Sequence, residues 1–389
     1  MSSNPIFILA VLMLIEGSIL YFSQKPAAAK FFKYLPSMFW IYFLPMIANT
    51  AGIIPSQSDV YGNITKFCLP ASLVLLLLSV DIKAILHLGR TALAMMGAGV
   101  LGIMVGGPVV VLIYKHWLPA DAWKAIGALS ASWIGGSANM IAVKEATNTP
   151  DSVFLPAVIV DTIVPYTWMG ILIALSAVQE RFDRWNKSDM TLIADLRART
   201  TAVSSGSGGR SIGKIFAMIG IGLGGTIVSL YVAGKMPVVD NLVNTMTWTI
   251  IIATVLGIVL SFTPVRRLES AGASELGFAV LFFVLASIGA RANMSHIAAS
   301  PILLLAGVTW VAIHAVFLLI AARLLHSPLS LAASASQAAI GGPASAPVVA
   351  GIYHPQLAPV GLLLAVLGNI VGTFLGLCCS YLCGLVSKI

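Results

Sequence analysis

Long apolar runs follow one another along almost the whole chain, and they decide what it can fold into. A helix that crosses a bilayer needs about 20 mostly apolar residues. The 389-residue sequence contains twelve runs of about this kind, at 5–22, 37–54, 64–80, 92–114, 125–143, 153–178, 212–232, 247–262, 276–288, 301–324, 329–349 and 359–386. Only 9% of its residues are charged, against about 25% in a soluble domain. We therefore predict an all-α polytopic membrane protein.

The basic residues orient the protein rather than bind a polyanion. Lys and Arg number 22 against 14 Asp and Glu, but they stand in short segments between apolar runs, as in membrane proteins. The four cysteines do not form a disulfide framework, because Cys68 stands alone and the other three share one apolar run. We expect no nucleic acid, no resident metal and no cofactor. We expect the protein in a cell membrane, and the bacterial inner membrane is the first choice.

Two segments with paired glycines match each other at a constant distance along the chain. Residues 127–143 align with 333–349 at an offset of 206, with six of seventeen positions identical. The match places Gly135-Gly136 on Gly341-Gly342. Transporters are often built from two weakly similar halves. We therefore predict two transmembrane repeats, 1–178 and 212–389, joined by a polar linker at 179–211.

The paired glycines predict a break in each of the two segments. Glycine costs about 1 kcal/mol relative to alanine inside a helix, and Pro343 removes a backbone donor. Unwound backbone at membrane depth is tolerated where it is buried in protein or lines a cavity, so matching breaks in two halves point to a substrate site. The alternative is a pair of tightly packed small-residue interfaces. The residues expected to bind substrate are Ser130, Gly135, Gly136, Ser137, Ser336, Gln337, Gly341, Gly342, Ser345 and Thr373.

Carboxylates inside apolar runs are functional candidates, because burying one in a bilayer costs several kcal/mol. Asp161 lies in the middle of one run, and its counterpart in the second half, allowing a two-residue insertion, is Asn369. One acid and neutral oxygens suit a cation site. The expected ion-binding residues are Asp161, Asn139, Thr162, Glu145 and Asn369. The alternatives are that Asp161 is packing glue and that Glu145, beside Lys144, reaches the membrane surface.

Two other ionisable residues stay off this set. Glu16 stands alone in the first run, where a neighbouring helix can hide it. His314 lies inside the run 301–324, and a buried histidine with its hydrogen bonds satisfied is the common explanation for such a position.

The residues 134–146, Asp161 and the residues 369–376 together resemble the YjcL-like membrane proteins of unknown function, the family of domain of unknown function 819. That family is similar to the cation/proton antiporter and bile-acid/sodium symporter superfamily. The resemblance implies inverted repeats, crossing broken helices, a core and a panel domain, elevator-like movement and a homodimer. It implies no particular substrate. The second broken segment has no acid and offers Ser345 in place of Asn139, so Asp161 and Glu145 would have to bind the cation.

The loop charges favour opposite orientations of the two halves. Lys25, Lys30, Lys33, Lys83 and Arg90 favour an outside N-terminus, and Arg266, Arg267, Arg323 and Lys388 favour a second half that starts inside. Six crossings in the first half would nevertheless place the basic linker outside, against the same rule. We predict inverted repeats with eleven to thirteen spans, and parallel repeats remain the alternative.

The predicted function is secondary active transport. Sodium or protons would be coupled to a small polar solute, anionic or zwitterionic, which binds between the two glycine pairs, where half-helix N-termini suit an anionic group. One alternative is a sodium/proton antiporter without an organic substrate, and another is a passive channel or receptor. We expect no enzyme, because no His-Glu-x-x-His pair, Gly-x-Ser-x-Gly elbow or phosphate loop is present in the sequence.

Overall fold

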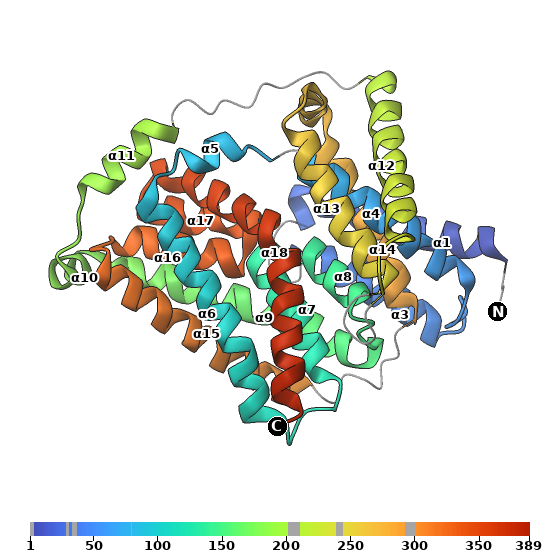
Figure 1. Cartoon of the computed structure of the whole chain (residues 1–389), viewed down its shortest axis with the longest axis horizontal. Helices are drawn as coiled ribbons and strands as arrows, with labels where there is room; N and C mark the ends of the chain where they lie inside the picture. Colours follow the sequence, from blue (N-terminus) through green and yellow to red (C-terminus); the bar gives the residue numbers. More distant parts are fainter. Residues whose placement is uncertain are drawn as a thin grey trace. The chain divides into compact units, whose positions relative to one another are not determined.

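The computed structural model describes residues 4–28, 31–32, 37–78, 80–200, 211–238, 244–291 and 300–389. These residues form α-helices and short 3-10 helices, and none of them forms a strand (Figure 1). The predicted all-α membrane fold is therefore confirmed. Lys30, Lys33 and the Gly- and Ser-rich end of the linker at 204–209 lie outside the described residues.

Eight helices of the described chain are long and apolar enough to cross a bilayer, and up to nine if a bent pair counts as one span. That pair, Thr245–Ser261 and Pro264–Ala271, is bent by 94°. The runs predicted at 125–143 and 329–349 each fold as two shorter helices instead of one long one. The count of eleven to thirteen spans and the inversion of the repeats stay predictions.

The chain forms two compact units, and each takes helices from both predicted repeats. Unit 1 comprises Met1–Ser79, Asn148–Thr162 and Ser207–Ser300. Its helices are α1 (Pro5–Ser23), η1 (Pro26–Ala28), α3 (Ser37–Thr50), α4 (Asp59–Leu78), the first part of α9 (Asp151–Leu175), α12 (Ile212–Ala233), α13 (Thr245–Ser261), η3 (Pro264–Ala271) and α14 (Ala273–Arg291). A capping box formed by Asn244 and Thr247 fixes the start of α13.

Unit 2 comprises Val80–Thr147, Ile163–Gly206 and Pro301–Ile389. Its helices are α5 (Ile82–Leu86), α6 (Arg90–Tyr114), α7 (Ala122–Gly135), α8 (Ser137–Ala146), the second part of α9, η2 (Ser176–Val178), α10 (Gln179–Asn186), α11 (Thr191–Thr200), α15 (Ser300–Leu324), α16 (Leu329–Ile340), α17 (Gly342–Tyr353), η5 (Pro355–Leu357) and α18 (Ala358–Ser387). Both glycine pairs therefore lie in unit 2. The repeat boundaries at 178 and 212 stay a prediction, because a compact unit and a repeat are different divisions of a chain.

Helices α7 and α18 lie side by side (Figure 1) and share the most extensive helix–helix contact of the described chain. Small residues recur every four positions along α18, at Gly368, Gly372, Gly376 and Ser380. A Cβ atom on Gly376 would lie 2.4 Å from the Ala131 Cβ, and one on Gly127 would lie 2.3 Å from the Ser380 Cβ. The two helices thus pack backbone to backbone, as small residues allow in membrane proteins.

The first part of the predicted linker is ordered helix rather than a plain connector. Helix α10 packs on α16, and α11 packs on α18. Two buried side chains of α10 explain the docking: Asp183 accepts a hydrogen bond from the Leu329 N–H at 2.9 Å, and Asn186 donates to the Ser327 carbonyl at 2.9 Å. These two hydrogen bonds hold α10 against unit 2 at the start of α16.

Candidate solute and ion site

The first predicted break is present between α7 and α8. Helix α7 ends at Gly135, Gly136 has φ +83°, and α8 begins at Ser137. A positive φ of this kind suits glycine, because a Cβ atom would clash with the backbone. The second residue of the glycine pair is therefore the position at which the helix direction is interrupted.

Asn139 ties this break to α18. Its amide nitrogen donates to the Gly135 carbonyl at 2.6 Å and to the Asn369 carbonyl at 3.3 Å, while the Thr373 hydroxyl donates to its amide oxygen. Asn139 is only 3% exposed. The structure thus brings together four of the predicted residues, but their polar groups form hydrogen bonds with one another where the helices cross.

The second break lies between α16 and α17. Helix α16 ends at Ile340, and Gly342, with φ +67°, begins α17. The Gln337 amide nitrogen reaches across the break and donates to the Ser345 hydroxyl at 2.8 Å. The Gln337 amide oxygen is buried, and no group of the described chain donates to it. This break therefore keeps a buried acceptor that the described part of the chain does not use.

Ser336, another predicted substrate ligand, belongs to a buried chain of hydrogen bonds. The Trp168 indole N–H donates to its hydroxyl at 2.8 Å, and His314 Nε2 lies 3.0 Å from the same oxygen. His314 Nδ1 lies 2.8 Å from the Gly99 carbonyl. Because a carbonyl only accepts, Nδ1 carries the hydrogen, and in the neutral ring the Ser336 hydroxyl donates to Nε2. His314 is thus fully buried and satisfied, as the sequence predicted.

The predicted ion-binding residues divide between the two units. Asp161 and Thr162 lie on α9 within unit 1, whereas Asn139, Glu145 and Asn369 lie in unit 2. Asp161 is half-buried, and the Thr162 hydroxyl donates to the Val158 carbonyl at 2.9 Å. A single ion site that combines Asp161 with Asn139 stays a prediction.

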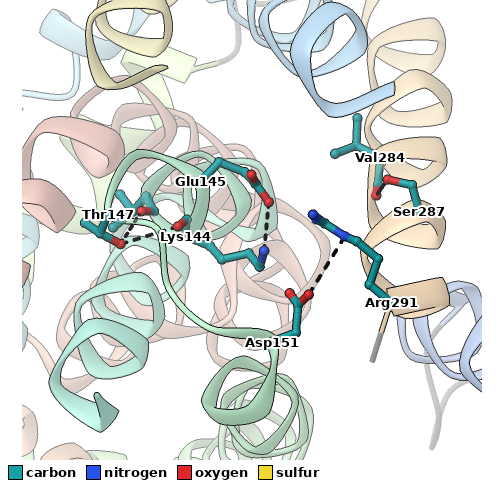
Figure 2. A network of polar contacts seen from close by, with 8 residues as sticks. Lys144, Glu145, Thr147, Asp151, Val284, Ser287 and Arg291 are labelled. Atoms are coloured by element: carbon teal, nitrogen blue, oxygen red, sulfur yellow. Dashed lines mark hydrogen bonds and ion pairs between the residues drawn. The ribbon is translucent and has the colours of Figure 1, made fainter. Parts of the chain in front are cut away.

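Charged pairs occur in both units, and Figure 2 shows one of each. In unit 2 the Lys144 Nζ lies 2.8 Å from the Glu145 carboxylate, with both side chains largely buried. In unit 1 the Arg291 guanidinium lies 3.8 Å from the Asp151 carboxylate. Glu145 therefore has a cation beside it in its own unit, and its role as an ion ligand stays a prediction.

Two predicted ligands, Ser130 and Ser137, and two residues that were not predicted, Trp168 and Asp183, remain. The Ser130 hydroxyl donates to the Gly127 carbonyl at 2.6 Å, and Ser137 is half-buried at the start of α8. Trp168 and Asp183 were not predicted to matter, yet they fix Ser336 and the start of α16. No local pattern in the sequence marks them, because their partners are distant in the chain.

These features define a class: an α-helical, multi-pass membrane protein in which two broken helices share one compact unit. A family model described as "Protein of unknown function (DUF819)" matches residues 10–384, and the chain belongs to this family. The chain is also 26% identical over 349 residues to the "Uncharacterized membrane protein YjcL" of Bacillus subtilis (strain 168). The aligned region covers 85% of this chain and 86% of that protein. The resemblance to the YjcL-like family is confirmed, and the superfamily placement stays a prediction.

Proposed function

We propose that the protein is a secondary active transporter that couples sodium or protons to the movement of a small polar solute, anionic or zwitterionic. One observation carries the proposal: at the break between α16 and α17, the buried Gln337 amide oxygen accepts no hydrogen bond from the described chain. It is one of several buried side-chain atoms that have no hydrogen bond within the described chain. Such an atom can take a water or a bound molecule, and this one lies beside a helix break.

The end of α17 beside this atom favours an anionic group. The first backbone N–H groups of a helix have no partner within the helix and carry a partial positive charge. The Gln337 amide nitrogen and the Ser345 hydroxyl lie 2.8 Å apart at this end. A solute with an anionic group and a neighbouring hydrogen-bond donor would satisfy both the helix end and the amide oxygen.

Asp161 is the proposed cation ligand. A carboxylate within a membrane-spanning helix is costly unless it is neutralised, and a bound sodium ion or proton would do this. Coupling follows if the neutralised protein changes conformation more readily than the charged one, since differential affinity shifts a two-state equilibrium. The elevator-like movement and the antiporter/symporter superfamily belong to this proposal, as does the cell membrane as its location.

A sodium/proton antiporter is the second candidate. It is favoured by the hydrogen bonds that engage Asn139, Ser336 and Thr373, because these bonds leave few groups for an organic solute. Antiport needs a carboxylate that binds either cation and nothing more.

The test uses the purified full chain in liposomes. Thermal stability is first screened against small acids, amino acids and dipeptides, with and without sodium, because a ligand that binds the folded state raises stability. Uptake of a stabilising solute under a sodium or pH gradient is then measured for wild type and Asp161→Asn. The proposal expects a loss of at least about tenfold, or about 1.4 kcal/mol in the barrier, with the half-exposed Asp121→Asn as the unaffected control.

Three results contradict parts of this proposal. Undiminished gradient-driven uptake by Asp161→Asn removes Asp161 from the mechanism. A change of internal pH on adding sodium, without any solute, favours the antiporter. Flux that does not saturate and needs no gradient indicates a channel.

A further inference from the structure

The helix α10 presents two different faces. Asp183 and Asn186, three residues apart, share the face that is buried in unit 2. Arg181 shares the opposite face with Arg184 and Trp185, which follow it at three and four residues. All three are exposed, and Trp185 is 64% exposed. The buried face of this helix thus carries two polar side chains, and a basic, aromatic face is outside.

A further cation from another helix completes this outer face. Arg323, near the end of α15, donates to the Trp185 carbonyl at 3.1 Å, and its guanidinium lies 5.0 Å from the centre of the Trp185 ring. We name Arg181, Arg184, Trp185 and Arg323 the α10 patch. Within the described chain, Arg181 and Arg184 form no ion pair with a carboxylate. The patch therefore holds two exposed arginines that form no ion pair within the described chain.

The nearby acids offset this charge only in part. Asp183 is turned inward and accepts hydrogen bonds from the Leu329 N–H and from Ser188. Asp189 is exposed, and hydrogen bonds from Thr191 lower the pKa of its carboxyl. Glu180 is the remaining exposed acid of this segment, against the three arginines and Lys187.

The patch lies where two membrane-spanning helices end. The continuous helical stretch Asp151–Asn186 has 36 residues, whereas a bilayer is crossed by about 20. Its charged last part, α10, therefore extends beyond the hydrocarbon. Helix α15 also ends here, one residue after Arg323, at Leu324. By this length argument we expect the patch at the level of the lipid headgroups, where tryptophan is enriched and arginine meets phosphate.

We propose that the α10 patch is a binding site for the phosphate headgroup of an anionic phospholipid. Arginine binds phosphate with two parallel hydrogen bonds, and an indole ring prefers the headgroup region. A bound lipid would hold α10 in place and, through Asp183 and Asn186, the start of the broken helix α16. The proposal does not depend on whether the protein is a transporter.

The test measures unfolding temperature and lipid binding of the full chain in nanodiscs. Discs of phosphatidylcholine alone are compared with discs that contain increasing fractions of phosphatidylglycerol. We expect phosphatidylglycerol to stabilise wild type. The variant Arg181→Gln/Arg184→Gln/Arg323→Gln should lose most of this gain, and the affinity for phosphatidylglycerol, measured by native mass spectrometry, should fall by at least about tenfold. The matched control removes three exposed cations elsewhere, as Lys66→Gln/Arg267→Gln/Lys388→Gln, and should respond like wild type.

Each other outcome overturns the proposal. An equal loss in the control variant means that total charge, not the patch, attracts the lipid. Equal stabilisation of wild type by inorganic phosphate in phosphatidylcholine discs means that the site takes soluble phosphate. If the triple variant does not fold, the single variants Arg323→Gln and Trp185→Ala are measured in the same way, and an unchanged lipid effect in both excludes the patch.

Discussion

The two breaks in unit 2 share a glycine pair but use their polar side chains differently. At the first break Asn139 bonds to Gly135, Asn369 and Thr373, so that α8 is fastened to α18. At the second break Gln337 bonds only across its own break, to Ser345, and keeps a buried oxygen without a donor from the described chain. The same sequence signature thus gives a fully hydrogen-bonded joint at the first break and a buried acceptor without a donor from the described chain at the second.

This difference distinguishes side chains that hold helices together from side chains that can bind a solute. A side chain whose donors and acceptors are all used by the protein loses those bonds if it turns to a solute, at about 1 kcal/mol for each. The Gln337 oxygen has no such bond to lose. Under the proposed function, the asymmetry favours the second break for the solute contact and the first break as a support, and the variants below test that division.

The largest effect is expected from adding one methyl group at the first joint. A Cβ atom on Gly368 would lie 2.0 Å from the Ile134 carbonyl oxygen, which is backbone and has little room to move. At the second break a Cβ atom on Gly341 would meet the ends of two side chains, Gln337 at 2.0 Å and Ser345 at 2.1 Å. Gly368→Ala should cost about 3 kcal/mol and Gly341→Ala about 1 kcal/mol or less.

Thermal unfolding in one detergent measures both variants. Gly220→Ala is the control, because no atom lies within 4 Å of its added Cβ. Equal losses for Gly368→Ala and Gly341→Ala would contradict the view that only the first joint is rigid.

A second pair of variants removes the two amides. Asn139→Leu deletes the acceptor of Thr373 and the donor to Gly135, all buried, and should cost about 2 kcal/mol. Gln337→Leu deletes one bond and an oxygen without a donor, and should cost about 1 kcal/mol or less. Solute-driven stabilisation and uptake should show the reverse order, with the greater loss in Gln337→Leu. A variant at Asn139 that folds and no longer binds solute would assign the contact to the first break.

The breaks could be predicted from the sequence, and the difference between them could not. Glycine pairs and Pro343 act through local backbone preferences, which any sequence shows. Two of the three partners of Asn139, Asn369 and Thr373, lie on α18, more than 200 positions along the chain, and no local rule connects them to it.

The serines show, residue by residue, that the sequence alone does not reveal hydrogen-bond partners. Ser130 and Ser336 looked alike as ligands, because a hydroxyl in an apolar run suggests a polar site. A serine in a helix often bonds to a carbonyl one turn before it, as Ser130 does with Gly127. Ser336 is engaged instead by Trp168 and His314 from two other helices. Only tertiary structure distinguishes these cases from a serine that is free to bind a solute.

The start of the second broken helix gives a smaller effect. Helix α16 has no side-chain cap of its own, and Asp183 supplies one from α10 by accepting from the Leu329 N–H. Asp183→Ala should cost about 1 to 2 kcal/mol, the usual loss of a helix cap. Asp121→Ala, which removes a half-exposed partner of Lys124, should cost about 0.5 kcal/mol or less. Unfolding curves that show no difference between the two would mean that α10 does not hold α16.

The smallest effect on stability is expected at His314. Two variants at this position should have similar stability and differ in solute binding. An asparagine there can reach the Gly99 carbonyl in place of Nδ1, whereas a glutamine can reach the Ser336 hydroxyl in place of Nε2. Each variant therefore keeps one bond, and each should cost about 1 kcal/mol. They differ in what they hold: glutamine keeps Ser336, the residue before Gln337, and asparagine does not. Solute binding should therefore survive in His314→Gln and weaken several-fold in His314→Asn and in Ser336→Ala. If the two amide variants bind solute equally well, the histidine only joins α15 to α6, and the position of the second break does not depend on it.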